Sequence, residues 1–393
     1  MNILIPTFSF PFLVKQNFDG KFVLAEAQAY VENGAEVKVI TPHYDSVPHL
    51  ETLDSGIKVV RFSYFFPSQW QCLKQPGKPL YSNLSWLGML QIPFLLLAMA
   101  FRILQYARWA DIIHAQWSLA ALLSLPAKWL FGTKVALTAR GSDIRLLPTW
   151  LNRFIHRQVD AAVDCFGPQS WNEEYKKNFP ARYLTLPLIV YGSKPVAQMP
   201  EDMSRALKGK EDSFIITYIG RFEQLKIRDN HLPLLTLIQA ASSWNQRNLN
   251  FHLFYLGDGT LKKEMEALIK GLNLTEKITL LGSRTNVMNY LQFSQLGVGG
   301  IAFNAVSQEI TMSGQPQLLV DSADNRNTPW ADGKNAIFIK PDDVAALVEK
   351  VGWVSRDPGR LKQIGRQAKK DMEPYFVAMK PGGALYLQAF ATL

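Results

Sequence analysis

Short apolar runs alternate with longer amphipathic stretches along most of the chain, and this pattern predicts strands that alternate with helices. In the first half the predicted strands are Asn2–Pro6, Glu36–Thr41, Val59–Phe62, Asp111–His114, Lys134–Thr138, Ala161–Phe166 and Arg182–Leu188. In the second half they are Phe214–Ile219, Asn250–Leu256, Lys277–Leu281, Leu296–Ile301, Gln317–Val320 and Ala336–Ile339. Predicted helices include Phe22–Asn33, Leu261–Gly271, Asn286–Phe293 and Val344–Val351. Such alternation is typical of an α/β fold with mostly parallel sheets.

The alternation fails once, around residues 191–212, where Gly192, Pro195 and Pro200 accompany a stretch of mixed charge. This break predicts a hinge between two α/β domains, residues 1–190 and 213–375. Ligands of parallel sheets bind at the carboxyl ends of the strands, and a two-domain enzyme offers the cleft between its halves. We therefore expect functional residues just after each strand.

One apolar run, Leu84–Phe101, leaves three interpretations open. Within it only Ser85 and Gln91 are polar, and Arg102 follows it. A helix buried against a sheet is the interpretation that the sequence favours. A transmembrane helix needs about 20 apolar residues, and Pro93 lies in the middle of this run. The third interpretation is a helix that lies on a membrane surface.

Composition narrows the classes of protein. The 393 residues are 48% hydrophobic and 19% charged, which excludes a disordered or fibrous chain. The net charge of +9 suits an anionic ligand or an acidic membrane surface, and no basic stretch interleaved with aromatic residues points to nucleic acid. The two cysteines, Cys72 and Cys165, lack metal or disulfide spacing and fit a reducing compartment. The first residues have no pattern of a signal peptide.

Three strand ends in the second half carry groups suited to a nucleotide. Gly220-Arg221 is followed by Lys226, and two cations at a strand–helix junction can neutralise a diphosphate. The tight loop Gly257-Asp258-Gly259-Thr260 can present amide groups to an anion. Glu309 is expected on the first turn of a helix that ends at Gly314, where a carboxylate can accept hydrogen bonds from a ribose. Each feature alone is also compatible with an ordinary turn or helix start.

In combination and in order, these motifs resemble those of the family 4 glycosyltransferases. The resemblance covers nearly the whole chain and includes further segments: Leu281-Gly282-Ser283-Arg284, Glu309–Pro316, Ala331–Ala336, Asp111–Trp117 and Thr138–Asp143. It implies the GT-B fold, in which two Rossmann-like domains face each other across a cleft. It also implies that residues 376–393 form a helix crossing back to the first domain.

The resemblance implies a role for each matching residue. Arg221 and Lys226 would hold the donor diphosphate and stabilise the leaving nucleotide. The remaining donor-nucleotide positions would be Gly20, Gly220, Gly257, Ser283, Arg284 and Glu309, with Glu309 on the ribose and backbone groups around Ser283 and Arg284 on the base. Phe303, Asn304 and Ala305 would lie beside the donor sugar. On the acceptor side the matching positions are His114, Gln116, Arg140 and Asp143.

The chain differs from the family pattern at three of these strand ends. Ile301 stands where the family has the first of two Glu residues, and Gln116 and Arg140 stand where it often has His. Arg140 would either contact an anionic donor sugar or acceptor or pair with Asp143, and His114 would either face the acceptor or be a hydrogen-bonded histidine at a strand end.

The implied reaction is retaining transfer of a sugar from a UDP- or GDP-linked donor to a hydroxyl of a glycan, a lipid-linked acceptor or a small molecule. Cell-envelope polysaccharide or glycolipid synthesis is the expected pathway, with a cytoplasmic enzyme of the hexosyltransferase class that is peripheral to an anionic inner membrane surface. No metal or other cofactor is expected, because the two cations would replace it and the sequence has no Asp-x-Asp triplet. The alternatives are a catalytically impaired relative that only binds a nucleotide or glycan, and a nucleotide-sugar epimerase of the same fold.

Overall fold

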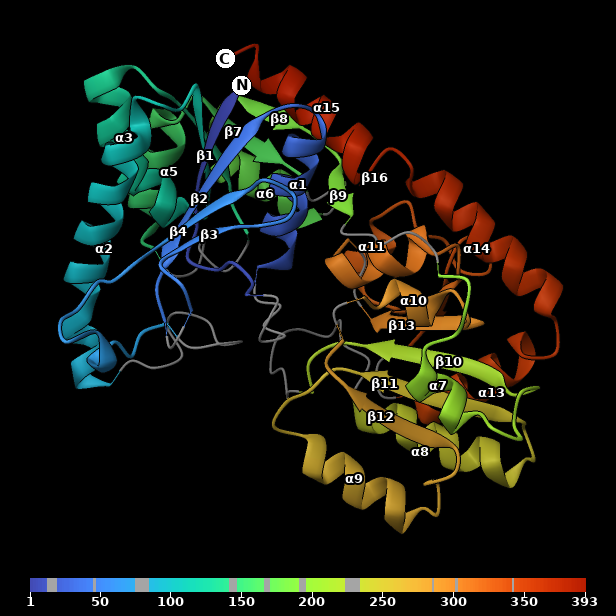
Figure 1. Cartoon of the computed structure of the whole chain (residues 1–393). Coiled ribbons are helices and arrows are strands. Elements are labelled where there is room, and N and C mark those ends of the chain that lie inside the picture. Colours follow the sequence, from blue (N-terminus) through green and yellow to red (C-terminus); the bar gives the residue numbers. More distant parts are fainter. Residues whose placement is uncertain are drawn as a thin grey trace. The chain divides into compact units, whose positions relative to one another are not determined.

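The computed structural model describes residues 1–12, 20–44, 47–74, 85–140, 147–165, 170–190, 196–222, 234–284, 286–300, 303–340 and 343–393. The chain divides into two compact units, each built on its own mostly parallel sheet (Figure 1). The described residues of Met1–Cys165, Asn172–Tyr191 and Val377–Leu393 belong to the first unit, and those of Gly192–Phe376 to the second. The predicted α/β class with two Rossmann-like sheets is confirmed. The predicted domain limits stay predictions.

The first unit contains a sheet with the strand order β3-β4-β2-β1-β5-β6-β7-β8, in which β3 runs antiparallel to β4. Its strands are β1 (Asn2–Pro6), β2 (Glu36–Pro42), β3 (Leu50–Thr52), β4 (Lys58–Phe62), β5 (Ile112–Gln116), β6 (Lys134–Thr138), β7 (Ala161–Asp164) and β8 (Tyr183–Thr185). A small separate sheet joins β9 (Leu188–Val190) and β16 (Phe376–Ala378).

Helices cover both faces of this sheet (Figure 1). One face carries α2 (Trp86–Ala107), α3 (Ser118–Phe131) and α5 (Thr149–Gln158). The other carries α1 (Lys21–Glu32) and α15 (Met379–Phe390), while η2 (Ser68–Trp70) and α6 (Ser170–Asn178) lie in connections. The last helix packs closely on α1, because a Cβ atom at Gly383 would lie 2.1 Å from the carbonyl oxygen of Ala29.

The second unit contains a sheet with the strand order β12-β11-β10-β13-β14-β15. Its strands are β10 (Phe214–Ile219), β11 (Phe251–Leu256), β12 (Ile278–Gly282), β13 (Leu296–Gly300), β14 (Gln317–Val320) and β15 (Ile337–Ile339). Its helices are α7 (Glu201–Ala206), α8 (Leu234–Gln246), α9 (Lys262–Gly271), α10 (Met288–Leu291), α11 (Ala305–Met312), α12 (Ala323–Arg326), α13 (Val344–Val354) and α14 (Pro358–Met372). The strand order reverses direction between β10 and β13, which is where doubly wound sheets bind ligands.

Most predicted strands match observed strands within a residue or two, and the differences have simple causes. The predicted strand Arg182–Leu188 is divided into β8 and β9, which belong to different sheets. The short strands β3 and β16 were not predicted, because three residues carry too little pattern. Ile301, at the end of one predicted strand, lies outside the described residues.

Part of the predicted hinge is packed structure. Met203 and Leu207, in and just after α7, are buried against the hydrophobic core of the second unit. The sequence of this segment offers few apolar residues, so its helix has no continuous apolar face and packs through these few contacts.

The apolar run forms α2, which is long and apolar enough to cross a membrane by length and composition alone. Only 28% of its most apolar window is buried. Leu95, Met99 and Ile103 point into the core, whereas Leu97 and Phe101 are exposed. The helix therefore packs against the sheet with one side only. Leu84, the first residue of the predicted run, lies outside the described residues.

Candidate active site

In the second unit, the backbone joins three strand ends into one continuous edge. The amide of Gly220 after β10 donates to Leu256 O over 3.1 Å, and that of Phe222 donates to Asp258 O over 3.0 Å. The amide of Gly257 in turn donates to Gly282 O over 3.0 Å. The predicted phosphate and base segments, which are far apart in sequence, therefore lie side by side at the carboxyl edge of the sheet.

Two glycines make this close contact feasible. A Cβ atom at Gly257 would lie 1.8 Å from the carbonyl oxygen of Gly220, and one at Gly259 would lie 2.4 Å from that of Phe222. Neither separation tolerates a side chain, since both partners are backbone atoms. From the sequence, these residues are expected to form a turn that presents amide groups. The structure shows in addition that the two glycines allow the loops after β10 and β11 to contact each other.

Arg221 lies at this edge with its side chain exposed. Among the side chains that the structure describes, none forms an ion pair with it. Lys226, its expected partner, lies outside the described residues.

The side chain of Arg284, the residue after Ser283, is hydrogen-bonded to an acidic and a phenolic side chain. Its guanidinium donates to Asp202 over 2.7 and 3.1 Å and to the Tyr290 hydroxyl over 2.9 Å. Although burial opposes it, hydrogen bonds from Arg284 and Tyr290 lower the pKa of Asp202, which keeps the carboxylate ionised. This cluster fixes α7 to the end of β12. The base contact expected from the backbone of the Ser283–Arg284 segment stays a prediction.

The predicted donor-sugar segment begins with an unusual backbone. Phe303 has a φ of 51°, a left-handed conformation that is strained for a bulky residue. Its ring is buried, 5.3 Å from the ring of Tyr375 and 5.5 Å from that of Phe376. Asn304 caps α11 by accepting a hydrogen bond from the Ser307 amide over 2.7 Å. Aromatic packing and the cap together hold the start of α11, with Ala305 as its first residue.

Glu309 lies further along its helix than predicted. The helix α11 begins at Ala305, so Glu309 is in its second turn and not in the first, and its side chain is buried with 8% exposure. The helix ends at Met312, just before Gly314. The expectation of a first-turn carboxylate is thus wrong, because Asn304 rather than a later residue caps the helix.

In the first unit, Gly20 comes at the start of α1, where its φ is 79°. A Cβ atom there would lie 2.2 Å from the carbonyl oxygen of Ser9. The loop after β1 and the start of α1 therefore meet at a position that only glycine can occupy.

The predicted acceptor residues Gln116 and Arg140 meet around a carboxylate that the sequence analysis missed. Glu26, on α1, pairs with Arg140 at 2.5 Å and accepts a hydrogen bond from Gln116 Nε2 over 2.8 Å. Arg140 also donates to Gln116 Oε1 over 2.6 and 2.9 Å, and its guanidinium lies 4.4 Å from the Phe22 ring. Burial opposes the charge on Arg140, but Glu26 more than offsets it and raises the pKa of Arg140.

His114 lies fully inside the first unit beside this group. Its Nδ1 is 3.0 Å from the Tyr30 hydroxyl and its Nε2 is 2.7 Å from Thr138 Oγ1. Burial lowers the pKa of His114 to about 4, so the ring is neutral at pH 7. Asp143, the alternative partner of Arg140, lies outside the described residues, and the acceptor-side roles stay predictions.

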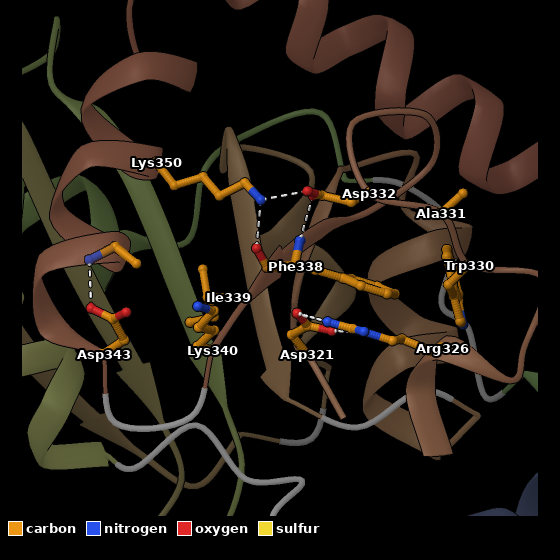
Figure 2. A pocket seen from close by; sticks show the side chains of 11 residues that line it. Asp321, Arg326, Trp330, Ala331, Asp332, Phe338, Ile339, Lys340, Asp343 and Lys350 are labelled. Atoms are coloured by element: carbon orange, nitrogen blue, oxygen red, sulfur yellow. Dashed lines mark hydrogen bonds and ion pairs between the residues drawn. The ribbon is translucent and has the colours of Figure 1, made fainter. Parts of the chain in front are cut away.

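A separate pocket of about 500 Å³ lies at the end of the second sheet near β14 and β15 (Figure 2). Its charged side chains are largely paired with one another: Lys350 contacts Asp332 over 2.6 Å, and Arg326 pairs with Asp321. None of the predicted donor residues lines it. The pocket is therefore distinct from the predicted donor edge.

Comparison with known families shows the family of the chain. Residues 199–371 match the family of glycosyl transferases group 1, and residues 20–166 match the glycosyl transferase 4-like domain. The chain belongs to the group 1 glycosyltransferases. The resemblance found in the sequence is thereby confirmed.

Solved structures confirm the GT-B fold of this glycosyltransferase. Sucrose-phosphate synthase from Thermosynechococcus elongatus has a TM-score of 0.71 at 16% identity, with 100% of both chains covered. HepE from Anabaena, solved with UDP-glucose, has a TM-score of 0.67 at 15% identity and the same coverage.

A curated relative from Campylobacter jejuni is 25% identical over 162 residues, which are 40% of this chain and 42% of that protein. Its name is N-acetylgalactosamine-N,N'-diacetylbacillosaminyl-diphospho-undecaprenol 4-alpha-N-acetylgalactosaminyltransferase. The chain spans less than half the length of the curated relatives it matches.

The contact between the strand-end loops can be tested by Gly257→Ala. The added Cβ atom collides with Gly220 O, so we expect the variant to lower the unfolding midpoint of the second unit and to weaken nucleotide binding at least about tenfold. Gly271→Ala is the control, because its Cβ position has no atom within 4 Å outside its own stretch of helix. Calorimetric titration with UDP and urea unfolding measure the two effects. Equal behaviour of the two variants would contradict the contact.

The buried ion pair can be tested by Glu26→Ala. Removing the carboxylate leaves the Arg140 guanidinium buried without its counter-charge, and we expect a loss of about 3–5 kcal/mol in the free energy of unfolding. Glu32→Ala, an exposed acidic position on the same helix, is expected to cost less than about 0.5 kcal/mol. Urea unfolding gives both values. Should Glu26→Ala not fold, Glu26→Gln, which keeps an acceptor without the charge, is expected to fall between wild type and Ala. Wild-type stability in Glu26→Gln would refute a role for the charge.

Proposed function

We propose that this glycosyltransferase moves a sugar from a UDP- or GDP-linked donor to a hydroxyl of a glycan, lipid-linked or small-molecule acceptor, with retention at the anomeric carbon. Family membership supports the class of reaction. The relative solved with UDP-glucose supports the class of donor, and the Campylobacter relative, named for a diphospho-undecaprenol substrate, supports a lipid-linked acceptor.

The observation that carries the proposal is the joined edge of the second sheet. Gly220, Gly257 and Gly282 bring three strand ends within backbone hydrogen-bonding distance, and Arg221 is exposed there. A diphosphate at this edge would meet backbone amides and a guanidinium together. Arginine suits such a ligand because its planar fork binds phosphate oxygens in pairs.

In the proposed reaction, the bond between the anomeric carbon and the diphosphate oxygen breaks while negative charge builds on the leaving diphosphate. Arg221, with Lys226 as its expected partner, would stabilise that charge without a metal. Preorganised groups of this kind contribute roughly 3–4 kcal/mol each to the barrier. Within the described residues no cluster of three or more His, Cys, Asp or Glu is placed to hold a metal ion.

The acceptor would approach the carboxyl edge of the first sheet, where Gln116 and Arg140 lie. Arg140 is held by Glu26 and Gln116, so its proposed role is to place a buried positive charge at this strand end, which favours a polar or anionic acceptor group. We propose synthesis of a cell-envelope polysaccharide or glycolipid as the pathway, in the cytoplasm, where Cys72 and Cys165 stay as free thiols.

Arg221→Ala tests the diphosphate site. We expect turnover to fall about 10²–10³-fold while the unfolding midpoint is unchanged, because an exposed side chain is removed. Arg247→Ala is the matched control, an exposed arginine of the same unit that pairs with Glu349. Mass spectrometry of reactions with a panel of nucleotide-sugars and acceptors measures transfer and donor hydrolysis. Equal turnover in the two variants would overturn the assignment. Donor binding without turnover for any pair would favour the catalytically impaired alternative, and a changed free nucleotide-sugar without acceptor would favour the epimerase.

Glu309→Gln tests the ribose site. The substitution keeps the size of the buried side chain and removes its charge, so we expect the Kd for UDP or GDP to rise about tenfold with a smaller effect on kcat. Wild type and Glu309→Gln are both titrated with the nucleotide and with its 2′-deoxy analogue. If Glu309 binds the ribose hydroxyl, the substitution should weaken binding of the deoxy analogue less than binding of the nucleotide. Unchanged nucleotide affinity would show that Glu309 does not contact the ribose.

A further inference from the structure

The helix α2 exposes a continuous row of large apolar side chains. Its exposed residues recur at helical spacing and therefore form one face: Trp86, Met89, Leu90, Phe94, Leu97 and Phe101. Trp86 is 75% exposed and Leu97 is 68% exposed. Monomeric soluble proteins rarely leave such a contiguous patch uncovered, so this face is expected to meet a partner.

The opposite side of α2 is fixed to the first unit. Leu95, Met99 and Ile103 are fully buried in its core, and Gln91 donates to Trp70 O over 2.8 Å and accepts from the Cys72 amide over 3.1 Å. Leaving the sheet to cross a membrane would expose this core and break these hydrogen bonds. The helix can therefore offer its apolar row only as part of the folded surface.

Neighbouring helices extend the row on the same side of the sheet. α3 packs between α2 and α5 in the core of this face, as Figure 1 also shows. The last turn of α3 exposes Trp129 and Leu130, and α5 exposes Trp150 and Phe154. Together with the row on α2, these side chains form what we call the apolar surface. Tryptophan is common at membrane interfaces, where its ring is apolar and its N–H meets headgroups.

The charges on these helices have one sign. The sequences of α2, α3 and α5 contain no Asp or Glu. Arg108, at the end of α2, and Arg153 and Arg157, on α5, are exposed. The Arg108 guanidinium also lies 4.8 Å from the Phe131 ring, which places this cation beside the end of α3. Apolar side chains on helices that carry cations and no acidic residue of their own complement an anionic lipid surface.

We propose that the apolar surface docks the enzyme onto a bilayer with anionic headgroups, with α2 lying at the interface rather than spanning it. Because α2 follows β4 and precedes the parallel strand β5, its first turn with Trp86 lies toward the carboxyl edge of the sheet. Gln116 and Arg140 lie at the same edge of this sheet. The docked face would thus bring lipid headgroups toward the acceptor side; this link to a lipid-linked acceptor rests on the proposed function, whereas the docking does not.

Flotation with lipid vesicles tests the docking on the full-length protein. Vesicles of phosphatidylcholine alone are compared with vesicles containing about one third phosphatidylglycerol, at low and at high salt. We expect co-flotation chiefly with the anionic vesicles and weaker binding in high salt. The double variant Arg153→Gln/Arg157→Gln should lower the partition coefficient by about fivefold for each cation removed.

A matched pair of leucine substitutions tests the surface itself. Leu97→Glu places a charge in the apolar row and should lower vesicle binding at least about tenfold, whereas Leu385→Glu should leave it unchanged. Leu385 is an exposed leucine of α15 on the other face of the same sheet. No co-flotation with either vesicle, or equal binding of the two variants, overturns the proposal. A wild-type dimer in light scattering that Leu97→Glu converts to a monomer, without vesicle binding, would overturn it in favour of a protein interface. UDP binding measured in parallel reports on the donor site, so failure of one proposal is distinguishable from failure of the other.

Discussion

The close approach of two backbone segments at the carboxyl edge of the second sheet is the constraint on which the candidate donor site depends. With 1.8 Å between the position of a Gly257 Cβ atom and Gly220 O, the loops after β10 and β11 can share hydrogen bonds only if residue 257 has no side chain. That contact fixes the position of the Gly220 backbone and therefore the position from which the Arg221 side chain extends. A flexible, solvated arginine becomes useful for an anion once its backbone is held in this way, because less freedom is lost on binding.

In the first unit, a different interaction positions the candidate site residues. Its strand-end residues Gln116 and Arg140 are polar and largely buried, and Glu26 from the neighbouring helix satisfies both. A guanidinium buried without a counter-charge would be costly, so the carboxylate is a condition for placing an arginine at this strand end. His114 remains neutral nearby, because burial lowers its pKa and its two ring nitrogens already have partners. Rigid backbone in one unit and a buried ion pair in the other thus position the two candidate sites.

Strand positions could be predicted from sequence because parallel strands buried on both faces are continuous apolar runs. Partners between distant residues could not. Glu26 is one acidic residue in an amphipathic helix and has the pattern of a solvated position, yet it is buried. Asp202 lies in a segment of mixed charge, and only the fold reveals its contact with Arg284. The sequence pattern places Glu309 one turn too early, because the N-cap of α11 is Asn304, five residues before Glu309.

The apolar helix α2 shows how the two kinds of information combine. Hydrophobicity alone cannot tell a buried helix from one that meets lipid, since both require apolar side chains. Contacts within the unit account for one side of α2 and leave Leu97 and Phe101 uncovered. The cations Arg108, Arg153 and Arg157 then indicate the kind of partner, because a purely protein interface has no need to exclude every acidic residue from three helices. Packing on one side and charge on the other are therefore both needed to infer a membrane surface.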